Sequence, residues 1–116
     1  MIGAAITDVP GSSDIFDRGF ISYSNAAKIA MLGVDPWLIE THGAVSEQVA
    51  RAMADGALDR SHASLAVAVT GVAGPGASER KPEGRVCFAL ASTGRRTRSE
   101  TVDFGAIGRA KVRRAT

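Results

Sequence analysis

The sequence has little cysteine, few aromatic residues and no long apolar run. Cys87 is its single cysteine, which excludes a disulfide within the chain and is typical of a protein from a reducing cytoplasm. No apolar stretch approaches the roughly 18 residues that a membrane span needs. The first residues lack the basic start of a signal peptide. Cysteine and histidine are too sparse for a zinc site. We therefore expect a cytoplasmic protein without a membrane span or a metal site.

What is present is the composition of one small globular domain spanning residues 1–116. The chain is 45% apolar and 22% charged, with a net charge of +2. Residues 1–60 hold four basic and eight acidic side chains, whereas residues 61–116 hold ten basic and four acidic ones. A basic half can bind phosphate or nucleic acid, but it is more often a solvated surface. Because only Phe88 and Phe104 could stack on bases there, we do not expect nucleic acid as a partner.

Apolar periodicity and turn residues divide the chain into interleaved helices and strands. Ser24, Asp35 and Ser46 each stand where a helix cap is expected. The predicted helices are 1–7, 25–32, 36–41, 47–60 and a segment from 105 onward. The predicted strands are 16–23, 64–70, 85–92 and 96–103, with 64–70 buried at the centre of the sheet and 96–103 at its edge. This order indicates an α/β domain with helices on both faces of one sheet.

Ser12 or Ser13, Tyr23 and Lys28 form the strongest candidate group for chemistry. A neutral lysine can take the proton of a serine hydroxyl, which gives a nucleophile suited to amide cleavage. Tyr23 follows a predicted strand and Lys28 lies one turn into the next helix, so the tyrosine could relay the proton or orient the pair. A plainer interpretation is that the serines only form a turn and that Tyr23 fills the core.

The segment TGVAGPG at 70–76 is a second candidate, because it follows a predicted buried strand. Its glycines would let backbone N–H groups approach a ligand at the carboxyl end of that strand. A loop that only connects two strands is an equally good interpretation. Four cations near the end of the chain either complement a helix dipole or bind a substrate phosphate: Arg109, Lys111, Arg113 and Arg114.

Three motifs, in this order and spacing, resemble the CinA C-terminal domain family, the nicotinamide-nucleotide amidases. They are PGSS at 10–13 with FDRGFISYSNAAK at 16–28, LGV at 32–34 with HGAVSE at 42–47, and TGVAGP at 70–75 with KPEGRV at 81–86. The resemblance implies a three-layer α/β/α sandwich, which here lacks the usual first helix and strand of the family. It also implies a homodimer.

The resemblance further implies hydrolysis of the carboxamide of nicotinamide mononucleotide, a small-molecule substrate, to nicotinate mononucleotide and ammonia. The reaction serves pyridine-nucleotide recycling and needs no cofactor. Ser13 would be the nucleophile, Lys28 the general base and Tyr23 a helper. The residues that would contact substrate are Ser12, Thr70, Gly71, Ala73, Gly74 and Pro75. The alternative is a catalytically inactive, truncated family member that acts as a dimerising or interaction module.

Overall fold

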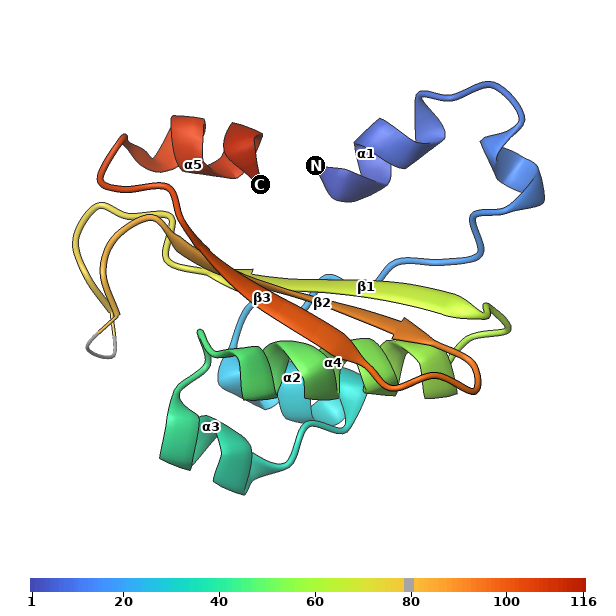
Figure 1. Ribbon diagram of the computed structural model, residues 1–116, viewed down its shortest axis with the longest axis horizontal. Helices are drawn as coiled ribbons and strands as arrows, with labels where there is room; N and C mark the ends of the chain where they lie inside the picture. The colour runs from blue at the N-terminus through green and yellow to red at the C-terminus, as the bar shows by residue number, and fades with distance from the viewer. Residues whose placement is uncertain (79–80) are drawn as a thin grey trace.

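The structure, a computed structural model, describes residues 1–78 and 81–116. In chain order its elements are α1 (Ile2–Thr7), the 3-10 helix η1 (Ser12–Asp14), α2 (Asn25–Leu32), α3 (Pro36–His42), α4 (Glu47–Asp59), β1 (Leu65–Gly71), β2 (Arg85–Ser92), β3 (Arg98–Asp103) and α5 (Arg109–Ala115). Figure 1 shows α1 and α5 on one side of the sheet and α2, α3 and α4 on the other. This arrangement confirms the predicted three-layer α/β/α fold.

The strands of the described chain form an antiparallel sheet in the order β1-β2-β3. Side chains alternate between the two faces of a strand, and the face toward α4 carries small residues. Ala68, Cys87 and Ala89 are buried in one cluster with residues of α4, including Val49 and Met53. Such small side chains let the helix lie close to the sheet, and the core of the domain therefore sits between α4 and β1–β2.

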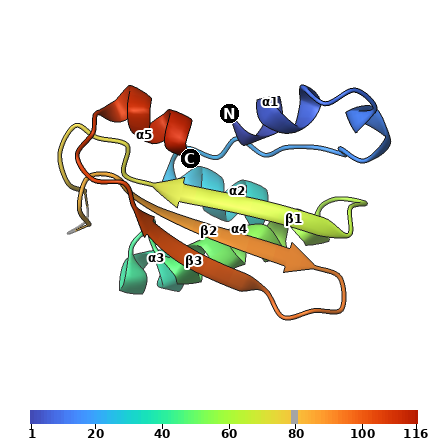
Figure 2. The ribbon, with the colours of Figure 1, turned by 45° about the horizontal axis from the view of Figure 1, so that its top comes forward.

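Two of the strand predictions are wrong. Residues 16–23 join no sheet, and Figure 2 shows this segment running from η1 to α2 outside the strands. Within the described chain β1 is an outer strand rather than the central one, and the side chains of Leu65 and Val67 are 56% and 49% exposed. The apolar run predicts burial on both faces, but Leu65 and Val67 lie on the face of β1 away from α4 and are exposed.

The predicted starts of α2, α3 and α4 are confirmed, because local side chains define them, whereas the helix predicted from 105 onward begins only at Arg109, where no side chain caps it. The hydroxyl of Ser24 accepts a hydrogen bond from the Ala27 amide at 3.0 Å and begins α2. A carboxylate oxygen of Asp35 accepts from the Trp37 amide at 2.9 Å and begins α3. The hydroxyl of Ser46 caps α4 in the same way. Each cap satisfies an amide that has no partner within its helix, so the sequence determines these starts.

Helices α2 and α4 approach each other closely at Gly56. A Cβ atom at this position would lie 1.8 Å from the carbonyl oxygen of Leu32, so only glycine fits. Leu32 is the last residue of α2 and lies one turn beyond Lys28. The contact at Gly56 therefore sets the position of the helix that carries the predicted base.

Candidate functional site

Lys28 is a buried charged residue on the inner side of α2. Its side chain is only 6% exposed, and Nζ donates a hydrogen bond to the backbone oxygen of Tyr23 at 3.0 Å. The Tyr23 side chain is 84% exposed, so the interpretation that it fills the core is wrong. The structure thus brings Lys28 to the backbone of Tyr23 and leaves the phenol ring open to solvent.

The two serines form the predicted turn, in the 3-10 helix η1. The Ser12 amide donates to the Val9 oxygen at 3.1 Å, and Gly11 has the left-handed backbone that the turn needs, with φ of 86°. Ser13 is exposed and Ser12 is half-buried. Figure 1 places η1 on the side of α1, whereas α2 lies on the other side of the sheet. The serine turn is therefore apart from Lys28 in this structure.

Thr70 and the glycine loop after it lie at the end of β1. The Thr70 side chain is buried, and its hydroxyl donates to the Ala44 oxygen at 2.8 Å. Beyond Gly71, the amide of Val72 donates to the Arg85 oxygen at 2.8 Å, which holds the base of the loop beside β2. The predicted binding residues Gly71, Ala73, Gly74 and Pro75 follow one another on this loop.

Two side chains that the sequence did not connect to the loop hold it in place. Arg109, at the start of α5, donates from Nη1 to the Gly74 oxygen at 3.0 Å. Glu83 accepts a hydrogen bond from the Gly76 amide at 3.2 Å. Its carboxylate fills the space beside Gly74 that a Cβ atom would need. Arg109 stood out in the sequence only as one of four cations, and nothing local to Glu83 signalled its contact.

The structure has two surface hollows of about 310 and 630 Å³, and Arg85, whose oxygen holds the base of the glycine loop, lines the smaller one. The smaller one is at the start of α4, where Glu47 accepts hydrogen bonds from Ser99 and Thr101 at 2.8 Å each. These two hydroxyls, followed by the nearby Arg51 guanidinium, hold the pKa of the Glu47 carboxyl below its ordinary value. No predicted site residue lines either hollow.

Across residues 1–78 and 81–116, no three histidine, cysteine or carboxylate side chains gather as a metal ion would require. Over the same two ranges, no helix has the length and apolar character needed to cross a membrane.

Comparison with known proteins gives one consistent family. The sequence model of the CinA C-terminal domain matches residues 1–116. A CinA-like protein of Mycobacterium avium is 59% identical over 91 residues, which cover 78% of this chain and 21% of that protein. A CinA-like protein of Chlorobaculum tepidum is 55% identical over 93 residues, covering 79% of this chain and 22% of the relative. The chain thus spans about a fifth of the length of these curated relatives.

Solved structures agree on the fold. The crystal structure of the competence/damage inducible protein CihA from Agrobacterium tumefaciens superposes with a TM-score of 0.93 at 48% identity, covering 98% of this chain and 70% of that one. A competence-damaged protein (CinA) superfamily protein from Escherichia coli superposes with a TM-score of 0.90 at 31% identity, covering 96% of this chain and 64% of that one. Similarity at this level shows that the chain shares the fold of these proteins.

Proposed function

The chain belongs to the CinA C-terminal domain family, and on that premise we propose that it hydrolyses the carboxamide of nicotinamide mononucleotide to nicotinate mononucleotide and ammonia. The observation that carries the proposal is the buried Lys28, held against the Tyr23 backbone at 3.0 Å. The reaction consumes one water molecule and requires no cofactor. It would serve pyridine-nucleotide recycling in the cytoplasm.

The environment of Lys28 suits a base. Burial of an ammonium group disfavours its charged form, and a cationic pyridinium ring bound beside it would act in the same direction. A neutral amine still has N–H groups, so Lys28 can donate to the Tyr23 oxygen while its lone pair accepts a proton. In the proposed step that proton comes from a serine hydroxyl as its oxygen bonds to the carboxamide carbon. The proton then goes to the leaving ammonia, and water hydrolyses the ester.

The nucleophile in this proposal is Ser13, with Ser12 as its neighbour in the same turn. Because η1 lies on the other side of the sheet from α2, the proposal requires the turn to approach α2 when the nucleotide binds. Ser13 is exposed and η1 is only three residues long, so few packing contacts oppose that movement. Ser13→Ala and Ser12→Ala distinguish the two hydroxyls, since only the nucleophile is essential for ammonia release.

The glycine loop and Arg109 suit the phosphate of the substrate. One guanidinium nitrogen of Arg109 binds the Gly74 oxygen, and the guanidinium has further N–H donors that can reach phosphate oxygens. Backbone amides of a glycine loop can approach an anion closely because no Cβ atom intervenes. We therefore assign the loop 71–75 to binding of the nucleotide and Lys28 to proton transfer.

The test is ammonia release from nicotinamide mononucleotide, with nicotinate mononucleotide measured in the same sample by chromatography. Lys28→Met removes the amine but keeps a long side chain suited to a buried position. Lys81→Met is the matched control, because Lys81 lies in neither the proton-transfer nor the loop assignment. Loss of turnover in the first variant alone supports the proposal, and equal turnover in both variants rejects it.

A second candidate is an interaction module that forms a homodimer without catalysis. The observation that favours it is the outer strand β1, whose Leu65 and Val67 side chains are about half exposed. No strand pairs with the outer edge of β1 within the described chain, and such edges readily pair with a strand of a second copy. Size-exclusion chromatography showing a dimer, together with no ammonia release, would favour this candidate over the amidase.

A further inference from the structure

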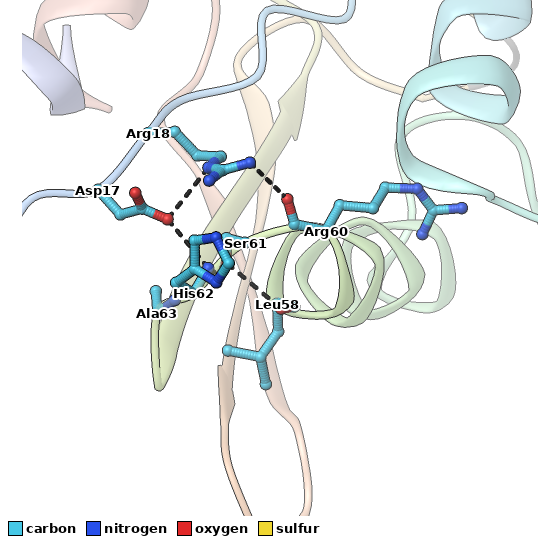
Figure 3. A network of polar contacts seen from close by, with 7 residues as sticks. All are labelled: Asp17, Arg18, Leu58, Arg60, Ser61, His62 and Ala63. Carbon is cyan, nitrogen blue, oxygen red and sulfur yellow. Dashed lines mark hydrogen bonds and ion pairs between the residues drawn. The ribbon is translucent and has the colours of Figure 1, made fainter.

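A group of polar contacts fastens residues 17 and 18 to the end of α4 and the turn after it. Arg18 donates from Nη1 to the Arg60 oxygen at 3.0 Å and from Nε to Asp17 at 3.0 Å. The same Asp17 oxygen accepts from the His62 amide at 3.0 Å. Figure 3 shows the two side chains turned toward Arg60 and His62. We call these four residues and their contacts the Asp17–Arg18 clamp.

The clamp holds residues 16–23, a segment that makes few other contacts with the rest of the domain. Residues 16–23 belong to no sheet, and the side chains of Ile21 and Tyr23 are 92% and 84% exposed. Apart from the clamp, Phe20 packs against the core and Lys28 binds the Tyr23 oxygen. This segment joins the serine turn to Lys28, so its position governs the geometry of both.

The clamp fastens this segment to the most deeply buried helix of the domain. Val49, Ala50 and Ala54 of α4 are fully buried. Arg60 is the cap at the end of α4, where carbonyl groups have no partner within the helix and a cation is favourable. The His62 amide and then the Arg18 guanidinium hold the pKa of the Asp17 carboxyl below its ordinary value, because both contacts favour the charged form.

We propose that Asp17 and Arg18 are positioning residues for the amide-hydrolysing site, because the clamp anchors residues 17 and 18 to the end of α4 and so sets the point from which the serine turn before them approaches Lys28. The inference rests on the proposed function for its catalytic consequence. The hold on residues 16–23 itself is independent of that function. The two parts can therefore be tested separately.

The first test observes Tyr23 directly, since the chain has one tyrosine and one tryptophan. Protein labelled with ¹⁵N only at tyrosine and tryptophan gives one backbone amide signal for Tyr23, with Trp37 as the internal reference. We expect Arg18→Ala and Asp17→Asn to shift or broaden the Tyr23 signal and to leave both signals of Trp37 in place. Arg95→Ala, which removes an exposed arginine of the β2–β3 turn, should change neither residue.

A Tyr23 signal identical to wild type in a folded Arg18→Ala protein would overturn the proposal. If Arg18→Ala also displaces the Trp37 signals, the substitution has disturbed the whole fold. The Tyr23 signal of Asp17→Asn then serves as the test of the clamp. This variant keeps the shape of the side chain and removes only its charge. An unchanged Tyr23 signal in Asp17→Asn would overturn the proposal equally.

The second test measures turnover of nicotinamide mononucleotide by the same variants. A displacement of about 1 Å at a reacting group can lower a rate by roughly 100-fold. We expect kcat of Arg18→Ala to fall about 10-fold to 100-fold with little change in KM, and Arg18→Lys to restore most of it. A folded Arg18→Ala protein with wild-type kcat would overturn the positioning role. Wild-type protein that releases no ammonia contradicts the proposed function instead, and the Tyr23 signal still tests the clamp.

Discussion

Replacement of Gly56 by alanine tests the helix crossing that positions Lys28. Two effects oppose each other at this site. Alanine favours a helix interior over glycine by about 1 kcal/mol, which would stabilise α4. The added Cβ atom, however, would lie 1.8 Å from the Leu32 oxygen, whereas Cβ contacts under 3.0 Å essentially never occur. The two helices must therefore separate, and the atom in the way belongs to the backbone, which cannot rotate aside as a side chain can.

The packing effect is the larger of the two. Overpacking of a close contact costs about 1 to 3 kcal/mol, and a separation on the order of 1 Å between two helices belongs at the upper end. After the gain in helix propensity, we expect a net loss of about 2 kcal/mol in the free energy of unfolding. That is a large share of the roughly 5 to 15 kcal/mol that stabilises a domain. The corresponding fall in Tm is about 10 °C.

Urea unfolding followed by circular dichroism measures this loss, with Gly3→Ala as the matched control. Gly3 lies in α1, and a Cβ atom there meets nothing within 4 Å. The control should therefore be as stable as wild type or more stable. A Gly56→Ala protein that is more stable than wild type would refute the reasoning, because helix propensity would then outweigh the crossing. A destabilised variant should also lose ammonia release, since α2 carries Lys28.

Two further predictions concern stability. Ser46→Ala removes the cap of α4, in which the hydroxyl accepts from the Val49 amide at 3.2 Å, and should lower the free energy of unfolding in urea by about 1 kcal/mol. The pKa values of Asp17, Glu47 and Asp103 are lowered in the folded protein from ordinary values of 3.8, 4.5 and 3.8. The three carboxylates therefore contribute fully to the free energy of unfolding above about pH 4.5. This contribution is lost as the pH falls through the lowered pKa values, so thermal melts should show a Tm that falls over that acidic range. Glu47→Gln should make that fall shallower, and an unchanged pH dependence would contradict the assigned contacts of Glu47.

Local interactions made much of the fold predictable from the sequence. The caps of α2, α3 and α4 act within three residues of Ser24, Asp35 and Ser46, so the start of each helix was predicted correctly. Strand pairing depends on distant partners, which the pattern at 16–23 could not reveal. The apolar run at 64–70 likewise did not show that β1 would be an outer strand in the described chain.

The contacts of the candidate site likewise include local ones, which the sequence can indicate, and distant ones, which it cannot. Tyr23 and Lys28 are five residues apart across a helix start, which lets Nζ reach the Tyr23 backbone oxygen, although the pattern does not show that the phenol ring faces solvent. The bond from Arg109 to the Gly74 oxygen spans 35 residues. The bond from the His62 amide to Asp17 spans 45 residues. Only the folded chain brings such pairs together, so sequence reasoning could name Arg109 as a cation but could not place it at the loop.

Ammonia release from nicotinamide mononucleotide by wild-type protein and by Lys28→Met tests the central claim most directly. General base catalysis contributes about 100-fold to 10,000-fold to a rate. We predict that wild type forms ammonia and nicotinate mononucleotide in equal amounts, and that Lys28→Met is slower by at least about 100-fold while remaining folded. Wild-type turnover in Lys28→Met, or no ammonia from folded wild-type protein, would contradict the account.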